Sequence, residues 1–349
     1  MINENSTMST VNRKRISLSR NYSDGILMDR AERVEPFSAS IMHQIKDNID
    51  LLNLGLYHNL GSLYEKMSSY IGVKQNQMLI TAGADESIKN IFNIFLKPKD
   101  TVCFPSPTYG MYHVYSNVYG VRKQELRYDN EFKINKKVLY DNIDNIKILF
   151  LPNPNHIEDL FTLDEIEKIC KKIASKQGIV VVDETYYGFG SYSCIPLIKN
   201  CKNLIVVRSL SKSFGLPSLR VGVTISNKKL ISIIESQRLA YEIPLLSQQV
   251  AEFFLDNIHI VNDYKDRCIE GRKFLVKSLG KKYKINGLNN YLININFKNE
   301  SVAKNIKQEL ESKDVWVSQY DSMIRLTIGP IEYMKTFLEK FTLVSDGLT

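Results

Sequence analysis

The chain has 349 residues, of which 44% are hydrophobic and 24% are charged. These proportions are typical of a folded protein of about two domains, and they exclude a disordered, collagen-like or disulfide-scaffold chain. The formal charge of +8 comes from scattered basic residues, so we expect no nucleic-acid partner, whereas an anionic small substrate is compatible with it.

Membrane segments and metal sites are not predicted. Residues 1–20 are polar and have no apolar core, which indicates a flexible N-terminal tail rather than a signal peptide or an anchor. No apolar run reaches the roughly 18 residues of a spanning helix, so we expect a cytoplasmic protein without a membrane partner. The five cysteines include no CxxC pair and the five histidines no HExxH spacing, which argues against a disulfide framework and a metal site.

Residues 21–72 are predicted to form an N-terminal arm that contributes to a small domain, and residues 73–245 to form a large α/β domain. Strands are predicted at residues 78–81, 101–104, 146–151, 179–182, 204–208 and 221–225, and helices at residues 85–96, 163–175 and 229–235. The runs IVVVD and LIVVRS are too continuously apolar for half-exposed strands. This pattern predicts a mainly parallel sheet flanked by helices.

The C-terminal part of the chain follows a different pattern. Helical periodicity over residues 246–280 predicts a long connecting helix. Residues 281–349 are predicted to form a smaller C-terminal α+β domain, with strands at 291–297, 315–318 and 323–328 and helices at 302–312 and 331–341.

Polar residues that follow the strands of such a sheet are the first candidates for a site, because ligands bind beyond the carboxyl ends of parallel strands. Residues 81–85 (TAGAD) join a strand to a helix, and they form either a plain turn or an anion site at the helix N-terminus. Asp183 ends the IVVVD strand, where it either caps the next turn or pairs with a cationic ring nitrogen. Tyr186 follows three residues later.

The segment RSLSKSFGLPSLRVG, residues 208–222, places Lys212 after a buried strand and among hydroxyl groups. A lysine in this setting can have a lowered pKa and form a Schiff base with an aldehyde cofactor. Ser209, Ser211 and Arg220 are suited to binding a phosphate. The apolar strand and the arginine favour a binding site over a surface loop.

Together these motifs resemble those of fold-type I pyridoxal-phosphate enzymes, specifically the class I/II aminotransferases and their histidinol-phosphate aminotransferase-like branch. The resemblance covers residues 25–345 and follows the family's order: TAGADE, SPTYGMY, PNPN, VDETYYGF, SLSKSFGLPSLRVG and MIRLTIG. It implies that pyridoxal 5′-phosphate is the cofactor.

The resemblance gives each matched position a role. Lys212 resembles the lysine that holds the cofactor as an internal aldimine and moves the proton between the substrate α-carbon and the cofactor C4′. Asp183 resembles the aspartate that keeps the pyridine nitrogen protonated, Tyr186 the tyrosine that hydrogen-bonds the cofactor O3′, and Tyr109 the aromatic residue that stacks on the ring. The residues expected to hold the cofactor phosphate are Gly83, Ala84, Asp85, Ser209, Ser211 and Arg220.

Two further positions bear on assembly and substrate. Tyr57 is similar to the tyrosine that reaches the cofactor phosphate of the neighbouring subunit, which implies a homodimer with the N-terminal arm among its contacts. Arg325, in MIRLTIG, is similar to the arginine that grips the substrate α-carboxylate as a bidentate fork.

Three segments depart from the family's pattern. PNNPTG appears as PNPNHIED, so either Asn155 or His156 supplies the contact to O3′, with Asn155 preferred. Ala31 stands where an asparagine is usual in the segment that covers the substrate. Residues 317–318 (VS) lack the arginine that binds the phosphate of histidinol phosphate, so we expect Arg33 or another cation to replace that charge.

The leading hypothesis is a homodimeric pyridoxal-phosphate-dependent aminotransferase. It would move an amino group from an amino-acid donor, expected to be glutamate, to a small keto acid or keto acceptor, and a phosphorylated acceptor fits the basic charge. The alternative is a phospho-amino-acid decarboxylase of the same fold, which would use the same lysine, aspartate and arginine. A non-enzymatic module would be expected to lack Lys212 or Asp183, and an NAD-binding protein would need a GxGxxG after an early strand, which this sequence does not have.

Overall fold

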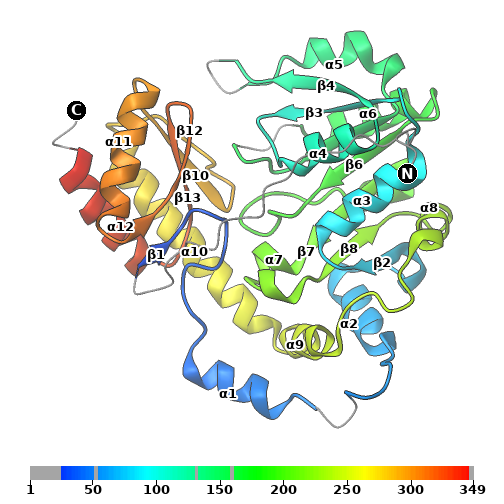
Figure 1. Ribbon diagram of the computed structural model, residues 1–349, viewed down its shortest axis with the longest axis horizontal. Coiled ribbons are helices and arrows are strands. Elements are labelled where there is room, and N and C mark those ends of the chain that lie inside the picture. Colours follow the sequence, from blue (N-terminus) through cyan, green and yellow to red (C-terminus); the bar gives the residue numbers. More distant parts are fainter. Residues whose placement is uncertain (1–24, 51–53, 130–132, 158–160, 346–349) are drawn as a thin grey trace, which may run out of the picture.

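The computed structural model describes residues 25–50, 54–129, 133–157 and 161–345. The predicted flexible tail over residues 1–20 lies outside these residues. Figure 1 shows a large sheet with its helices and, beside it, a small sheet carried by the C-terminal part of the chain. Helix α10 (Ile258–Leu279) runs from the small sheet toward the helices of the large one (Figure 1).

The large sheet has seven strands in the order β2-β8-β7-β6-β5-β3-β4. Five neighbouring strands, β7, β6, β5, β3 and β4, pair in parallel, and β8 is antiparallel to both β7 and β2. The prediction of a mainly parallel sheet flanked by helices is therefore confirmed. The strands are β2 (Met78–Thr81), β3 (Thr101–Ser106), β4 (Arg122–Arg127), β5 (Ile148–Pro152), β6 (Ile179–Asp183), β7 (Leu204–Ser209) and β8 (Gly222–Ile225).

Helices cover both faces of this sheet, which is why its central strands read as continuous apolar runs. In β6, Val180 and Val182 enter the core on one face, and Ile179 and Val181 enter the core on the other. The first face is covered by α2 (Gly61–Ile71), α5 (Lys136–Asn142), α6 (Leu163–Ala174) and α9 (Leu245–Asp256). The second is covered by α3 (Ala84–Phe95), α4 (Met111–Val118) and α8 (Lys228–Ile234).

Helix α6 shows how the sequence sets an element of this layer. Thr162 caps its N-terminus, and the side chain of Glu165 returns a hydrogen bond to the backbone N–H of Thr162, which completes a capping box. The apolar residues Ile166, Ile169 and Ile173 recur at helical spacing and are fully buried. The predicted helix over residues 163–175 therefore agrees with the structure to within one residue.

The small sheet has four antiparallel strands in the order β12-β13-β10-β9. They are β9 (Ile285–Asn286), β10 (Leu292–Asn296), β12 (Ser318–Tyr320) and β13 (Met323–Thr327). This sheet shares a core with α10, α11 (Glu300–Glu311) and α12 (Ile331–Ser345). The predicted strand over residues 315–318 is divided in the structure, because β11 (Val315–Trp316) leaves the sheet to pair with β1 (Ile26–Leu27).

One predicted helix differs from the structure, and several elements of the structure were not predicted. The helical pattern over residues 246–280 forms two helices, α9 and α10, since the backbone leaves the helical region at Asn257 (φ −113°, ψ 46°). Strand β4 had no prediction, because four of its six residues, RKQELR, are charged. It pairs only with β3, and an edge strand tolerates such a sequence. Helices α1 (Ala39–Asp47), α2, α4 and α5 were also not predicted.

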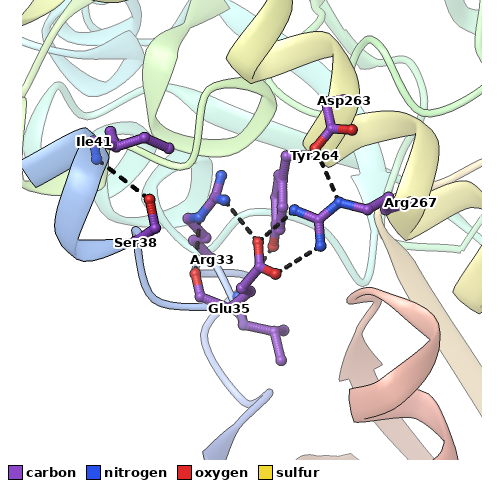
Figure 2. A network of polar contacts seen from close by, with 8 residues as sticks. Arg33, Glu35, Ser38, Ile41, Asp263, Tyr264 and Arg267 are labelled. Atoms are coloured by element: carbon purple, nitrogen blue, oxygen red, sulfur yellow. Dashed lines mark hydrogen bonds and ion pairs between the residues drawn. The ribbon is translucent and has the colours of Figure 1, made fainter.

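The N-terminal strap, residues 26–35, runs along the small sheet and α10. Besides the parallel β1–β11 pair, the backbone N–H of Thr327 donates to the carbonyl oxygen of Met28 at 2.9 Å. Figure 2 shows the other end, where Arg267 on α10 donates two hydrogen bonds to the carboxylate of Glu35, at 2.6 and 2.7 Å. The first described residues of the chain thus pack with its C-terminal part.

The remaining short elements are 3₁₀ helices and a four-residue helix. The 3₁₀ helices are Gln75–Gln77, Ile143–Asn145, Ile195–Lys199, Pro217–Leu219 and Glu235–Gln237. Helix α7 (Leu210–Ser213) follows β7 directly and carries Lys212.

Candidate active site

A cavity of about 340 Å³ lies beyond the carboxyl ends of β5, β6 and β7, between the large sheet and β13. This is the place where ligands bind in open α/β sheets. The sequence-predicted residues that line it are Ala84, Asp85, Tyr109, Asn155, Asp183, Tyr186, Ser209, Ser211, Lys212, Arg220 and Arg325. The alternative candidate His156 lines it too.

Lys212 extends from α7 into this cavity, and its Nζ donates a hydrogen bond to the backbone carbonyl of Arg30 in the N-terminal strap at 3.2 Å. Burial lowers the pKa of Lys212 to about 8, with the charge of Glu32 opposing this shift and those of Arg220 and Arg325 adding to it. The charged form is disfavoured because water is largely excluded from the amine. The neutral, nucleophilic form of the amine is therefore reached at a lower pH than for an exposed lysine.

We expect the amine of Lys212 to become reactive as the pH rises through about 8. The measurement is the rate of acetylation of each lysine in the cofactor-free protein between pH 6 and 11, read by mass spectrometry. Lys171 is the control, because it is exposed on α6 and its ion pair with Glu167 raises its pKa above the ordinary value. If Lys212 titrates together with Lys171, the lowered pKa is wrong.

Asp183 is the last residue of β6, and its buried carboxylate faces the cavity. One oxygen, Oδ2, accepts a hydrogen bond from the hydroxyl of Tyr112 at 2.7 Å, and the other accepts from the backbone N–H and the hydroxyl of Thr185. Burial raises the pKa of Asp183, and these hydrogen bonds oppose the shift. A cation in the cavity would find here a carboxylate whose orientation is already fixed.

Tyr112 and Thr185 are site residues that the sequence did not single out. Tyr112 lies three residues after Tyr109 and is fully buried on α4, while Thr185 follows Asp183 by two residues. Thr185 could have been found from its place in the predicted turn. Tyr112 offered no such signal, because it reaches Asp183 only once α4 packs beside β6.

The predicted phosphate-binding residues gather at the N-terminus of α3. Arg220 adopts a left-handed backbone conformation (φ 53°), and a Cβ added to Gly83 would lie 2.5 Å from its Nη2 atom. A Cβ on Gly222 would lie 2.3 Å from the carbonyl carbon of Gly83. Glycine is therefore required at both positions so that the turn before α3 can approach β8 and Arg220.

We call the predicted phosphate-binding residues the phosphate cup: Gly83, Ala84, Asp85, Ser209, Ser211 and Arg220. They supply the donors that a phosphate needs. The hydroxyl of Ser209 lies 2.9 Å from that of Ser211, and both residues are buried in the cavity wall. Together with the backbone N–H groups at the start of α3 and the Arg220 guanidinium, they form a site that favours a dianion. The residues present therefore fit the phosphate of pyridoxal phosphate, and Lys212 and Asp183 fit its aldehyde and its ring nitrogen.

The remaining wall of the cavity includes three tyrosines and an arginine: Tyr109, Tyr186, Tyr320 and Arg325. Tyr109 packs edge-on against Tyr112, with ring centroids 6.0 Å apart. Burial raises the pKa of Tyr186 to about 12, which keeps its hydroxyl protonated and able to donate. Arg325 on β13 lies over the ring of Tyr320, with its Cζ atom 4.4 Å from the ring centroid.

Asn155 and His156, the two candidates for the O3′ contact, both reach the cavity. The side-chain oxygen of Asn155 accepts a hydrogen bond from the Thr108 hydroxyl at 3.3 Å, and its nitrogen donates to Pro107 O and to the Tyr128 hydroxyl. The preference for Asn155 stays a prediction.

Three predicted residues, Gly83, Arg33 and Tyr57, do not line this cavity; Gly83 lies in the turn against Arg220 described above. The expectation that Arg33 supplies a substrate-binding charge is not supported, because its side chain is held elsewhere: Nη2 donates to Glu35 at 3.0 Å, and the guanidinium lies over the ring of Tyr264 at 3.5 Å (Figure 2). Arg30, three residues earlier, lines the cavity instead. Tyr57 is 81% exposed and stacks on Tyr241 with ring centroids 4.1 Å apart, away from the cavity of its own chain.

A half-buried lysine, a buried carboxylate and a phosphate cup around one cavity of this sheet define a fold-type I pyridoxal-phosphate enzyme. The chain belongs to the aminotransferase class I and II family, whose model matches residues 26–341. It is a pyridoxal-phosphate-dependent aminotransferase.

Similar proteins agree with this assignment. The chain is 32% identical to a histidinol-phosphate aminotransferase of Buchnera aphidicola subsp. Cinara cedri, over 77% of this chain and 79% of that protein. It is 29% identical to one of Caldanaerobacter subterraneus subsp. tengcongensis, over 86% and 88%. The crystal structure of the histidinol-phosphate aminotransferase from Clostridium acetobutylicum shares the fold, with a TM-score of 0.79 and 20% identity over 92% of this chain and all of that one.

A solved structure with cofactor also matches. The histidinol-phosphate aminotransferase from Sinorhizobium meliloti in complex with pyridoxal-5′-phosphate has a TM-score of 0.81 and 15% identity, and the match covers 93% of this chain and 92% of that one. In the part of the present chain that the structure describes, no three His, Cys, Asp or Glu side chains are grouped as a metal site would require. Among the same residues, no helix has the length and apolarity needed to cross a membrane.

Proposed function

We propose that this enzyme transfers an amino group from glutamate to the keto form of a small phosphorylated amine such as histidinol phosphate. The observation that carries the proposal is the placement of the Lys212 amine, the Asp183 carboxylate and the Arg325 guanidinium around one cavity. The histidinol-phosphate aminotransferases among the relatives support the phosphorylated acceptor. The cytoplasmic location expected from the sequence is part of the proposal.

When bound, pyridoxal phosphate supplies an aldehyde that condenses with amines and a ring that stabilises negative charge on the substrate α-carbon. In our proposal, Lys212 Nζ would hold the cofactor through its aldehyde. The Lys212 amine would also take up the proton that leaves the substrate α-carbon and later return it. The lowered pKa of Lys212 favours this role, because only the neutral amine can accept a proton.

The other residues bind and orient. Asp183 would pair with the ring nitrogen and favour its protonated form, the Tyr186 hydroxyl would donate to the cofactor O3′, and Tyr109 would stack on the ring. Arg325 grips the substrate carboxylate through two parallel N–H groups. The phosphate is held by the cup residues Gly83, Ala84, Asp85, Ser209, Ser211 and Arg220, with Gly83 contributing by allowing the close approach of Arg220.

A homodimer is also part of the proposal. Tyr57 stacks on Tyr241, and both rings are exposed, as are the apolar side chains of Leu54, Leu56, Leu239 and Leu246. Large exposed apolar side chains of this kind favour an interface between proteins. In the proposed dimer this surface packs against a second copy, and Tyr57 reaches the phosphate of the neighbouring subunit's cofactor.

The acceptor end of the cavity differs from the family's pattern. Ser318, which stands where relatives of the branch carry an arginine, donates a hydrogen bond to the carbonyl oxygen of Asp29 and contributes no charge. Arg30 lines the cavity, and its guanidinium is partly exposed. We assign to Arg30 the contact with the acceptor phosphate that the sequence had assigned to Arg33.

The test of this function is a pair of half-reactions on the cofactor-loaded enzyme. Glutamate should remove the yellow absorbance of the bound cofactor, and the phosphorylated keto acceptor should restore it, whereas its dephosphorylated analogue should do so at least about tenfold less well. Arg30→Ala should raise the KM for the phosphorylated acceptor and leave the KM for glutamate unchanged. The control is Arg127→Ala, on the exposed edge strand β4, which should change neither.

Two outcomes would contradict the proposal. No spectral response to glutamate or to any other amino acid would remove transamination. Release of carbon dioxide from a phospho-amino acid, without amination of the cofactor, would establish the decarboxylase, which the relatives' names do not favour.

A further inference from the structure

The contact between His156 and Arg325 joins the loop after β5 to the small sheet. The Nδ1 atom of His156 lies 3.0 Å from Nη1 of Arg325, although the two residues are 169 positions apart. His156 also packs edge-on against the ring of Tyr186, with centroids 5.7 Å apart. The histidine therefore lies between a proposed cofactor contact and the proposed substrate contact.

The chemistry of this contact fixes the state of the histidine. A guanidinium has only donors and stays protonated, so Nδ1 must be the acceptor, and the ring proton must be on Nε2. Burial, together with the charges of Arg325 and Lys212, holds the pKa of His156 well below its ordinary value. The imidazole is thus neutral and accepts from Arg325 through its lone pair.

The backbone of His156 is held by the same strands. Asn294 on β10 donates to the carbonyl oxygen of His156 at 2.9 Å, and Asn294 is the direct cross-strand neighbour of Arg325. Asn290 donates to the carbonyl oxygen of Asn155. One pair of strand positions, Asn294 and Arg325, therefore sets both the backbone and the ring of His156, which gives the contact with Arg325 a defined geometry.

A neutral acceptor leaves the charge of Arg325 available. Among the described residues, no carboxylate forms an ion pair with Arg325, and its other close neighbour is the ring of Tyr320. An aspartate or glutamate at position 156 would neutralise the guanidinium. The imidazole instead takes one N–H group and leaves the others, with the full positive charge, for an incoming carboxylate.

We propose that His156 is a positioning residue for Arg325: its Nδ1 lone pair aims the guanidinium at the substrate carboxylate without neutralising it. This inference rests on the proposed function, in which Arg325 binds the carboxylate of the donor. It gives the histidine a role in substrate affinity rather than in the proton transfer at Lys212.

The test compares His156→Ala, His156→Gln and His156→Asp with the wild type, all loaded with cofactor. Loss of a hydrogen bond to a charged group predicts a roughly 10- to 100-fold higher KM for glutamate in His156→Ala, with kcat changed by less than about threefold. His156→Gln, which retains an acceptor, should recover most of the affinity. His156→Asp should bind glutamate more weakly than His156→Ala, because the new carboxylate competes for Arg325.

A binding measurement without turnover separates positioning from a general loss of structure. Calorimetric titration with glutarate, an unreactive dicarboxylate, should show the same order of affinities, while an amine substrate without a carboxylate should keep its KM in all three variants. Equal glutarate affinity in wild type and His156→Ala would overturn the inference. If Arg325→Ala loses glutamate affinity in that case, the proposed function still stands; if the wild type does not respond to glutamate at all, the proposed function has failed.

Discussion

Replacing Lys212 with alanine should lower turnover by about 10⁴-fold while the protein stays folded. The amine extends from α7 into the cavity, and its lowered pKa suits it to accept a proton from carbon. Its side chain faces the cavity and not a core, so truncation removes only the hydrogen bond to the carbonyl oxygen of Arg30 and leaves the core packing intact. The measurements are the steady-state rate with glutamate and the far-ultraviolet circular dichroism spectrum.

A second readout does not depend on activity. Treatment with borohydride should attach the cofactor irreversibly to the wild-type chain at Lys212 and leave the Lys212→Ala chain unlabelled, as seen by mass spectrometry. Lys265→Ala is the matched control, because Lys265 on α10 is also half-buried with a lowered pKa but does not line this cavity. Labelling or full turnover in Lys212→Ala would remove Lys212 from the catalytic assignment.

Asp183→Asn should lower turnover by roughly 10²- to 10³-fold while the cofactor remains bound. Asparagine has nearly the same shape, so the contacts with Tyr112 and Thr185 can be largely retained, but it has no negative charge to keep the ring nitrogen protonated. The step that suffers is proton removal from the α-carbon, because the ring then stabilises the resulting charge poorly. The measurement is the rate of α-proton exchange of glutamate with deuterated water.

Tyr112→Phe is the companion variant. It removes one of three hydrogen bonds to the Asp183 carboxylate and leaves the charge, so we expect a loss of about tenfold or less. If Asp183→Asn keeps exchange within tenfold of the wild type, the charge of Asp183 is not needed and its role is to orient the cofactor only.

Much of the fold was predictable, because a strand that is covered on both faces of its sheet appears in the sequence as a continuous apolar run. The β6 run IVVVD places alternate residues in two different cores, and only a covered parallel strand needs that many apolar residues in succession. The edge strand β4 has no such apolar run, because one side of its backbone and most of its side chains face water. The predicted domain limits at residues 73, 246 and 281 stay predictions.

The candidate site was predictable where its residues end or follow a strand, as Asp183 and Lys212 do. Contacts between distant segments were not: Tyr112 and Asp183 are 71 positions apart, and no local pattern links them. Arg33 was misplaced because its charge could be read from the sequence, whereas its packing on Tyr264 depends on where α10 lies.

The N-terminal strap has a consequence for the order in which the protein can assemble during synthesis. Met28 accepts its hydrogen bonds from Thr327, a residue made 299 positions later, whereas the large sheet is complete in sequence by Ile225. The strap therefore has no partner while most of the chain is being translated, and the carbonyl of Arg30 cannot be held against Lys212 until the last strands have emerged. Early segments of a nascent chain fold first. The phosphate-binding residues can therefore come together on the ribosome before the N-terminal strap packs over Lys212.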